Sequence, residues 1–123
     1  MAVSNEDFEF NKLPFEKRKA DADNQLQKYP EKIPVIIQQA KSSKIILPET
    51  FKFKFLVPQE QKFGSFMYEV RKRISLSTEK ALFIFVNKTV PSSSSNMKDL
   101  YDKYKDTDGF LKLMFSEENA FGQ

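Results

Sequence analysis

The hydrophobic pattern of this 123-residue sequence changes its period near the middle of the chain, and this change limits the folds open to it. Residues 51–58 alternate between phenylalanine and lysine before ending in Leu-Val-Pro, which is the period of a strand with two different faces. Within residues 63–74, apolar side chains recur at the spacing of a helix. Shorter apolar segments predict three further strands: residues 35–37, residues 81–86 as a central strand buried on both faces, and residues 110–115.

Capping residues and a proline predict further helices before and between these segments. Ser4 and Asp7 have the spacing of a capping box, which predicts a short helix over residues 5–11. Pro14 suits the first position of a helix, and we expect this second helix to run to about Lys28. Asn96 is a candidate cap for one more short helix. The apolar side chains of that helix would be Met97, Leu100, Tyr101 and Tyr104.

The predicted order is helix, helix, strand, strand, helix, strand, short helix, strand. A hairpin, a crossing helix and two more strands make a mixed sheet with a helix across one face. We therefore expect an α+β protein, a ubiquitin-like β-grasp with a four-stranded mixed sheet, preceded by two N-terminal helices. Its parts would be a helical extension packed on the core (1–28), the β-grasp (29–116) and a flexible C-terminal tail (117–123). In the second strand, alternation is expected to put three phenylalanines on one face: Phe51, Phe53 and Phe55.

The residue types and segments that the sequence lacks narrow the functions open to the chain. It contains no cysteine and no histidine, which excludes disulfides, Cys/His zinc sites, thiolate nucleophiles and Ser-His or Cys-His pairs. Its three glycines are too scattered for a phosphate-binding loop. No signal peptide or apolar run of roughly 18–20 residues is present, which favours a cytoplasmic protein. What remains is a carboxylate or lysine enzyme, or a protein that functions by being bound.

The charge is unevenly distributed. Residues 28–73 carry ten basic and four acidic side chains, although the whole chain has a net charge of only +3. This pattern is compatible with a solvated lysine-rich surface, a docking face for acidic peptides or a nucleic-acid patch. The phenylalanines lie at core spacing rather than on a stacking platform, which argues against nucleic acid. Four aspartates are expected on a solvated helix face and the loop after it, and no two of them form an evident catalytic acid pair: Asp99, Asp102, Asp106 and Asp108.

Several short motifs follow one another in a fixed order along the chain. They are Phe15-Glu16-Lys17-Arg18, Tyr29-Pro30, Ile33-Pro34-Val35-Ile36, Leu56-Val57-Pro58, Arg71-Lys72-Arg73-Ile74, Phe83-Ile84-Phe85-Val86-Asn87 and Asp108-Gly109-Phe110-Leu111. In this order and spacing, the sequence resembles the GABARAP type of autophagy ubiquitin-like modifiers from about Pro14 to Gly122. The resemblance implies a modifier rather than an enzyme, with no metal and no cofactor.

In that family, a cysteine protease trims the tail and exposes a C-terminal glycine. A ubiquitin-activation-like enzyme takes this glycine as a thioester. A conjugating enzyme then transfers it to the amine of phosphatidylethanolamine. The matching position here is Gly122, so the resemblance implies cleavage of its bond to Gln123, next to Phe121. Glycine suits this chemistry because it has no Cβ to shield its carbonyl in a narrow enzyme channel. The modifier would be cytoplasmic, and on autophagosome and vesicle membranes when it carries the lipid.

The resemblance also implies that residues 51–58 form an edge strand that captures cargo-receptor motifs beginning with an aromatic residue and ending with an aliphatic one. The aromatic pocket would be lined by Asp21, Gln25, Pro34, Ile36, Lys54, Leu56 and Phe110. The aliphatic pocket would involve Phe55, Val57, Pro58, Phe66, Val70 and Arg73. Acidic residues of the motif would meet Lys28, Lys32, Lys52 and Lys54.

Some positions depart from the family pattern. Gln25, Gln61 and Glu69 stand where apolar residues are usual, and Arg73 is placed to pair with Glu69. The turn over residues 40–53 is about two residues longer, with unusual phenylalanines. The alternative function is an unconjugated β-grasp adaptor that binds peptides in vesicle trafficking. The lysines of the strand could equally serve only to protect an exposed edge.

Overall fold

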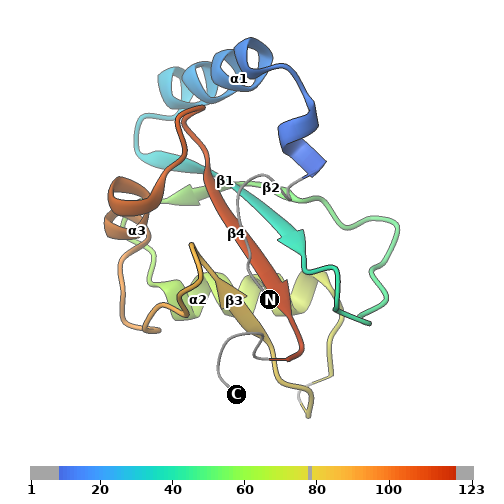
Figure 1. Cartoon of the computed structure of the whole chain (residues 1–123). Coiled ribbons are helices and arrows are strands. Elements are labelled where there is room, and N and C mark those ends of the chain that lie inside the picture. The colour runs from blue at the N-terminus through green and yellow to red at the C-terminus, as the bar shows by residue number, and fades with distance from the viewer. Residues whose placement is uncertain (1–8, 78, 119–123) are drawn as a thin grey trace.

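The computed structural model of the chain describes residues 9–77 and 79–118 (Figure 1). Its elements are a 3-10 helix η2 (Glu9–Lys12), α1 (Phe15–Lys28), β1 (Lys32–Gln39), β2 (Lys54–Pro58), α2 (Phe63–Arg73), β3 (Phe83–Phe85), α3 (Met97–Tyr104) and β4 (Leu111–Ser116). The order of helices and strands is the one expected from the sequence pattern.

The four strands form one mixed sheet in the order β2-β1-β4-β3. β1 pairs antiparallel with β2 and parallel with β4, while β3 pairs antiparallel with β4. Pro34 is tolerated inside the central strand β1 because the pairing with β4 begins only at Val35, opposite Leu111. This sheet, with α2 across it, confirms the β-grasp fold.

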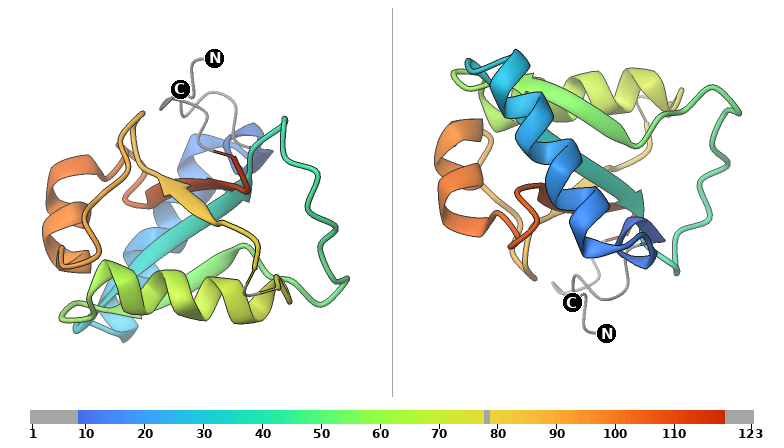
Figure 2. Two further views of the ribbon diagram at one scale, coloured as in Figure 1. Left: turned by 90° about the horizontal axis from the view of Figure 1, so that it is seen from below. Right: turned by 90° about the horizontal axis from the view of Figure 1, so that it is seen from above.

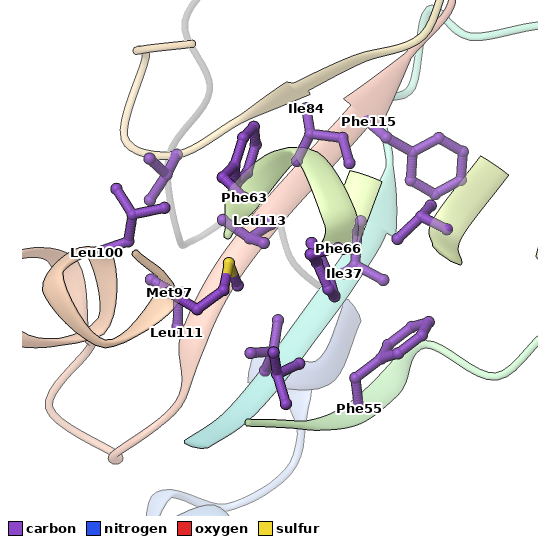
Figure 3. Close-up of a cluster of buried hydrophobic side chains, with 14 of the residues drawn as sticks. Ile37, Phe55, Phe63, Phe66, Ile84, Met97, Leu100, Leu111, Leu113 and Phe115 are labelled. Carbon is purple, nitrogen blue, oxygen red and sulfur yellow. The ribbon is translucent and has the colours of Figure 1, made fainter. Parts of the chain in front are cut away.

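α1 and α2 cover opposite faces of the sheet (Figure 2). Alternate residues of β1 point to opposite faces, and Val35 and Ile37 therefore join the large cluster under α2. Ile36 points the other way and packs with Ala22 of α1. Figure 3 shows the larger cluster, to which α2 contributes Phe63 and Phe66 and every strand contributes at least one buried residue.

The N-terminal prediction is only partly correct. The helix expected over residues 5–11 is a 3-10 helix in its described part, Glu9–Lys12, and its capping residues lie outside the described residues. The second helix begins at Phe15 with Pro14 as its N-cap, and it ends at Lys28. Phe10 of η2 is buried against Phe110, with ring centroids 4.9 Å apart, so this segment belongs to the core beside α1.

The strand predicted over residues 51–58 starts late, at Lys54, and its phenylalanines do not share a face. The backbone N–H of Ile37 donates to the carbonyl of Phe53, and the chain bends there. Phe51 lies 6.5 Å from Phe55 on the α2 side, whereas the ring of Phe53 lies 6.4 Å from Phe10 on the α1 side. The bend rotates the backbone, so the sequence alternation fails at this point.

The prediction of a central strand over residues 81–86 is wrong. β3 spans only Phe83–Phe85 and lies at the end of the sheet, paired with β4 alone. The central strands are β1 and β4, and all six residues of β4 are buried. β3 is nevertheless apolar because Ile84 packs into the cluster beneath α2.

A buried ionic cluster joins α1 to β4, and it makes the expectation of a solvated Asp108 wrong. Asp108 is fully buried; Arg18 Nη1 lies 2.6 Å and Lys112 Nζ 2.7 Å from its carboxylate. Lys112 also contacts Asp106 at 2.8 Å and the side chain of Asn11. The N-terminal segment is thereby tied to the last strand through charges that lie about 90 residues apart in the chain.

The same cluster sets the charge state of Asp106. Burial on its own would raise the pKa of Asp106, but hydrogen bonds from Lys112 and the Thr107 amide, with the charges of Lys112 and Arg18, bring the pKa below its ordinary value. Because the folded-state pKa is depressed, the stability contributed by this group is present above the ordinary pKa and is lost as the pH falls through the lowered one.

Gly109 allows α1 to approach this turn closely. Its φ of +93° lies in the left-handed region, and a Cβ there would come within 2.9 Å of the Cβ of Ala22. Next to it, the hydroxyl of Tyr101 donates to the Gly109 carbonyl at 2.7 Å. The Asp108–Gly109 turn therefore sets the distance between α1 and the sheet.

Candidate functional site

β2 is the outer strand of the sheet, as the peptide-binding hypothesis requires. The hydrogen bond from Ile37 to Phe53 places residues 53, 55 and 57 in the hydrogen-bonded pairs with β1. The backbone groups of Lys54 and Leu56 consequently point away from β1, where an incoming strand can pair with them. Pro58 has no N–H and ends this row of donors.

A pocket of about 250 Å³ opens beside this edge, between β2 and α1. Its walls are Gln25, Pro34, Lys54, Phe55, Leu56 and Phe110. Five of these were predicted for the aromatic pocket, and Phe55 is added. The other two predicted residues do not line it: Ile36 is buried beneath α1, and Asp21 is paired with Lys54.

The two polar side chains that line this pocket, Gln25 and Lys54, both contact Asp21 behind them. Lys54 Nζ lies 2.6 Å from the Asp21 carboxylate, and the Gln25 side-chain amide donates to the same carboxylate at 3.4 Å. Lys54 is therefore not a free cation, because an acidic group of a ligand would have to compete with Asp21 for it. The apolar part of the pocket is formed by Pro34, Phe55, Leu56 and Phe110.

The residues predicted for the aliphatic pocket come together as a closed core. Phe55 is 9% exposed, and Val57, Phe66 and Val70 are 3% or less. The rings of Phe55 and Phe66 meet edge to face with centroids 5.6 Å apart. Arg73 covers this contact from outside, with its guanidinium 5.0 Å from the centre of the Phe55 ring. An aliphatic side chain could enter only if Arg73 and α2 shifted. Pro58, at the end of the strand, is exposed.

The other charged positions surround the edge without forming a cluster. Lys28, Lys32 and Lys52 are all exposed, and the ammonium of Lys32 lies 6.0 Å from the centre of the Tyr29 ring. The predicted pairing of Glu69 with Arg73 is wrong. Glu69 pairs with Lys72 at 3.4 Å, because the guanidinium of Arg73 lies over the ring of Phe55 instead.

The predicted conjugation residues Phe121, Gly122 and Gln123 lie outside the described residues. Just before them, the Glu117 carboxylate accepts hydrogen bonds from the hydroxyl of Ser43 at 2.6 Å and the amide of Lys44 at 2.7 Å. The hydrogen bond from Ser43 is the main reason that the pKa of Glu117 falls below its ordinary value. This contact holds the end of β4 against the long turn after β1.

Residues 9–77 and 79–118 show neither a metal site nor a membrane-spanning helix. No group of three acidic side chains there lies close enough together to hold a metal ion. Within these same ranges, none of the helices has the length and apolar character needed to cross a membrane.

Known proteins resemble this chain over nearly its whole length. Residues 17–122 match the model of the family described as Autophagy protein Atg8 ubiquitin like. Autophagy-related protein 8 of Mycosarcoma maydis is 48% identical over 113 residues, which cover 92% of this chain and 94% of that protein. Autophagy-related protein 8e of Arabidopsis thaliana is 48% identical over 108 residues, or 88% of this chain and 87% of that protein.

Two solved structures share the fold. Trypanosoma brucei ATG8 superposes with a TM-score of 0.83 at 39% identity, covering 89% of this chain and 94% of that one. Plasmodium falciparum Atg8, in complex with a Plasmodium falciparum Atg3 peptide, superposes with a TM-score of 0.77 at 37% identity, covering 88% and 94%.

The mixed sheet, the crossing helix α2 and the open edge at β2 define a ubiquitin-like protein. The family match and the relatives then place it more narrowly. This chain belongs to the Atg8 family of ubiquitin-like proteins, and it is a modifier of autophagy.

Proposed function

We propose that this modifier is conjugated through the carboxyl of Gly122 to the amine of phosphatidylethanolamine, after a cysteine protease removes Gln123. The match to the family model, which extends to residue 122, supports this position. In the last step, the amine attacks the thioester carbonyl of Gly122, an amide forms, and the thiol of the conjugating enzyme leaves. The chain supplies the acyl group and is not itself an enzyme.

Lipid attachment explains how the protein reaches autophagosome and vesicle membranes from the cytoplasm. Two acyl chains contribute about 0.8 kcal/mol for each buried CH₂ group, which is enough for stable anchoring without a membrane-spanning segment. The partners that this proposal requires are the processing protease, the activating enzyme and the conjugating enzyme. Support for the last comes from the relative solved with an Atg3 peptide.

The second part of the proposal is that β2 captures short aromatic-x-x-aliphatic motifs of cargo receptors by strand addition. The observation that carries it is the pocket between β2 and α1, which opens beside unpaired backbone groups of the edge strand. Burying an aromatic side chain of about 200 Å² is worth roughly 5 kcal/mol before ordering costs. Surface lysine pairs add at most about 1 kcal/mol each, so the pocket should set affinity and the lysines should set the association rate.

Intact-mass and lipid analysis of the protein isolated from its own cells tests the conjugation. A modifier should lose Gln123 and carry a phospholipid on Gly122. An unconjugated peptide-binding adaptor, which would use the same edge strand, should retain Gln123 and carry no lipid.

Replacing Leu56 with alanine should weaken the binding of an aromatic-x-x-aliphatic peptide about tenfold, because an apolar wall of the pocket is lost. Replacing Lys54 with alanine should act mainly on the association rate, and its effect should shrink as salt rises. Titration and stopped-flow association at two salt concentrations separate the two effects.

Leu56 is the better test residue because it is only partly buried, whereas Phe110 is fully buried and supports the core. The exposed Ile46 provides a matched control, and its replacement by alanine should leave the affinity unchanged. Equal, salt-independent losses for Leu56→Ala and Lys54→Ala would contradict this division of roles.

A further inference from the structure

A cavity of about 460 Å³ lies beside the end of β4, and it shares no lining residue with the pocket beside β2. The turn after β1, the segment after α2 and the end of β4 meet there (Figure 1). Ile74 at this cavity is buried, whereas Ile46 is 91% exposed. An apolar side chain that entered the cavity would therefore cover Ile46. Four aliphatic residues and two lysines supply most of the lining: Ile45, Ile46, Ile74, Leu76, Lys44 and Lys80.

The last strand delivers the chain to this cavity at a fixed point. Glu117 follows β4 directly and lines the cavity. Its carboxylate accepts hydrogen bonds from the Ser43 hydroxyl and the Lys44 amide, both of which belong to the turn after β1. Because this contact fixes Glu117, the residues that follow it begin at the cavity wall.

The end of the chain contains one side chain that suits such a cavity. Phe121 is the only large apolar residue among the last five. It is four residues beyond Glu117, so an extended chain can carry it up to about 13 Å from there. Since Glu117 itself lines the cavity, this reach is sufficient. The last five residues are Asn119, Ala120, Phe121, Gly122 and Gln123.

The charges at the cavity suit the same segment. Lys44 and Lys80 are exposed, and no acidic side chain in residues 9–77 and 79–118 forms a salt bridge with either of them. The carboxylate that ends the chain comes two residues after Phe121 and would bring a negative charge to these lysines. A segment that is already tethered also has an effective concentration far above that of a free peptide.

We propose that the C-terminal tail folds back on the body of the protein, with the Phe121 ring in this cavity and the terminal carboxylate near Lys44 and Lys80. The docked tail holds the bond between Gly122 and Gln123 against the body, where a protease that needs an extended substrate cannot bind it. This contact goes beyond the proposed conjugation and does not depend on it. Where both hold, release of the tail precedes processing.

Nuclear magnetic resonance of the whole chain tests the position of the Phe121 ring. With the isoleucine and leucine methyl groups labelled, we expect nuclear Overhauser effects between this ring and the methyl groups of Ile46 and Leu76. Their absence overturns the proposal. Effects from Phe8 to the same methyl groups in place of Phe121 would assign the cavity to the N-terminal segment and overturn it too. Effects that fade on dilution would assign the cavity to a second copy of the chain, with the same consequence.

A carboxypeptidase measures how much of the time the tail is docked, because it removes Gln123 only from the undocked form. Ile46→Ser and Leu76→Ser should each lose Gln123 about fivefold faster than the unaltered chain, as expected if the tail is docked about four-fifths of the time. A synthetic peptide of residues 115–123 gives the rate for a tail that cannot dock. Val90→Ser is the matched control, since this exposed valine does not line the cavity, and it should leave the rate unchanged. Thermal unfolding of each variant shows that it is folded.

The outcomes separate tail docking from conjugation. Release of Gln123 from the unaltered chain at the rate of the free peptide overturns the docking. Slow release that survives both Ile46→Ser and Leu76→Ser also overturns it, because the protection then has another source. Neither measurement uses the conjugation enzymes. A docked tail in a protein that carries no lipid on Gly122 would refute the conjugation alone, and lipid on Gly122 of a protein whose tail is undocked before processing would refute the docking alone.

Discussion

Replacing Gly122 with alanine is expected to abolish conjugation to phosphatidylethanolamine in cells that conjugate the unaltered protein. In the proposed conjugation, this carbonyl has to reach a catalytic cysteine and then a lipid amine, and an added Cβ would obstruct both approaches. The measurement is the fraction of the protein that carries lipid, by mass spectrometry, and the fraction that sediments with membranes.

A chain shortened to end at Gly122 is the control for the protease step. It should be conjugated in cells that lack the processing protease, whereas the chain that retains Gln123 should not. Normal membrane recruitment of Gly122→Ala, under conditions that recruit the unaltered protein, would refute conjugation at this residue.

Replacing Asp108 with alanine is expected to destabilise the fold by about 3–5 kcal/mol, because it removes the buried carboxylate that two cations share and leaves Lys112 with Asp106 as its remaining acidic partner. The affected groups are Arg18, whose side chain is 13% exposed, and Lys112, whose side chain is 1% exposed. Urea unfolding measures the loss directly, and the melting temperature should drop by about 10 °C or more.

Asp102 supplies the matched control. It pairs with Lys98 at 2.7 Å on the surface of α3, with about half of each side chain exposed, so Asp102→Ala should cost at most about 0.5 kcal/mol. If Asp108→Ala costs no more than this control, the buried cluster does not hold α1 to the sheet. Replacing the whole cluster by apolar side chains of similar volume should be far less harmful than removing Asp108 alone.

The fold could be predicted because each element carries its own local signal. The helical spacing of α2 and the β-branched residues of β1 need no knowledge of distant contacts. The position of β3 could not be predicted, since an apolar run reads the same for a central strand as for an end strand covered by helices. The bend at Phe53 was missed for a similar reason, because alternation in the sequence does not show where pairing with β1 stops.

Some residues of the candidate site could likewise be predicted from the sequence, and others could not. Gln25, Pro34 and Leu56 could be named only through the family resemblance, because nothing local in the sequence brings α1 next to β2. Phe10 and Asp108 were missed although they are buried, since each has its partner about 90 to 100 residues away. A possible signal for Asp108 was its position before Gly109, where a tight turn points a side chain inward.

β1 is synthesised early, but its parallel neighbour Leu111–Ser116 leaves the ribosome after every other strand in residues 9–77 and 79–118. Two strands that are distant in sequence can pair only after the chain between them has become compact. β1 and β4 are such a pair, and they form the middle of the sheet. A nascent chain therefore cannot complete its fold until the residues just before the proposed conjugation site have been made. Any product of interrupted translation that lacks β4 also lacks Gly122, so conjugation at Gly122, as proposed, would attach the lipid only to chains that are long enough to fold.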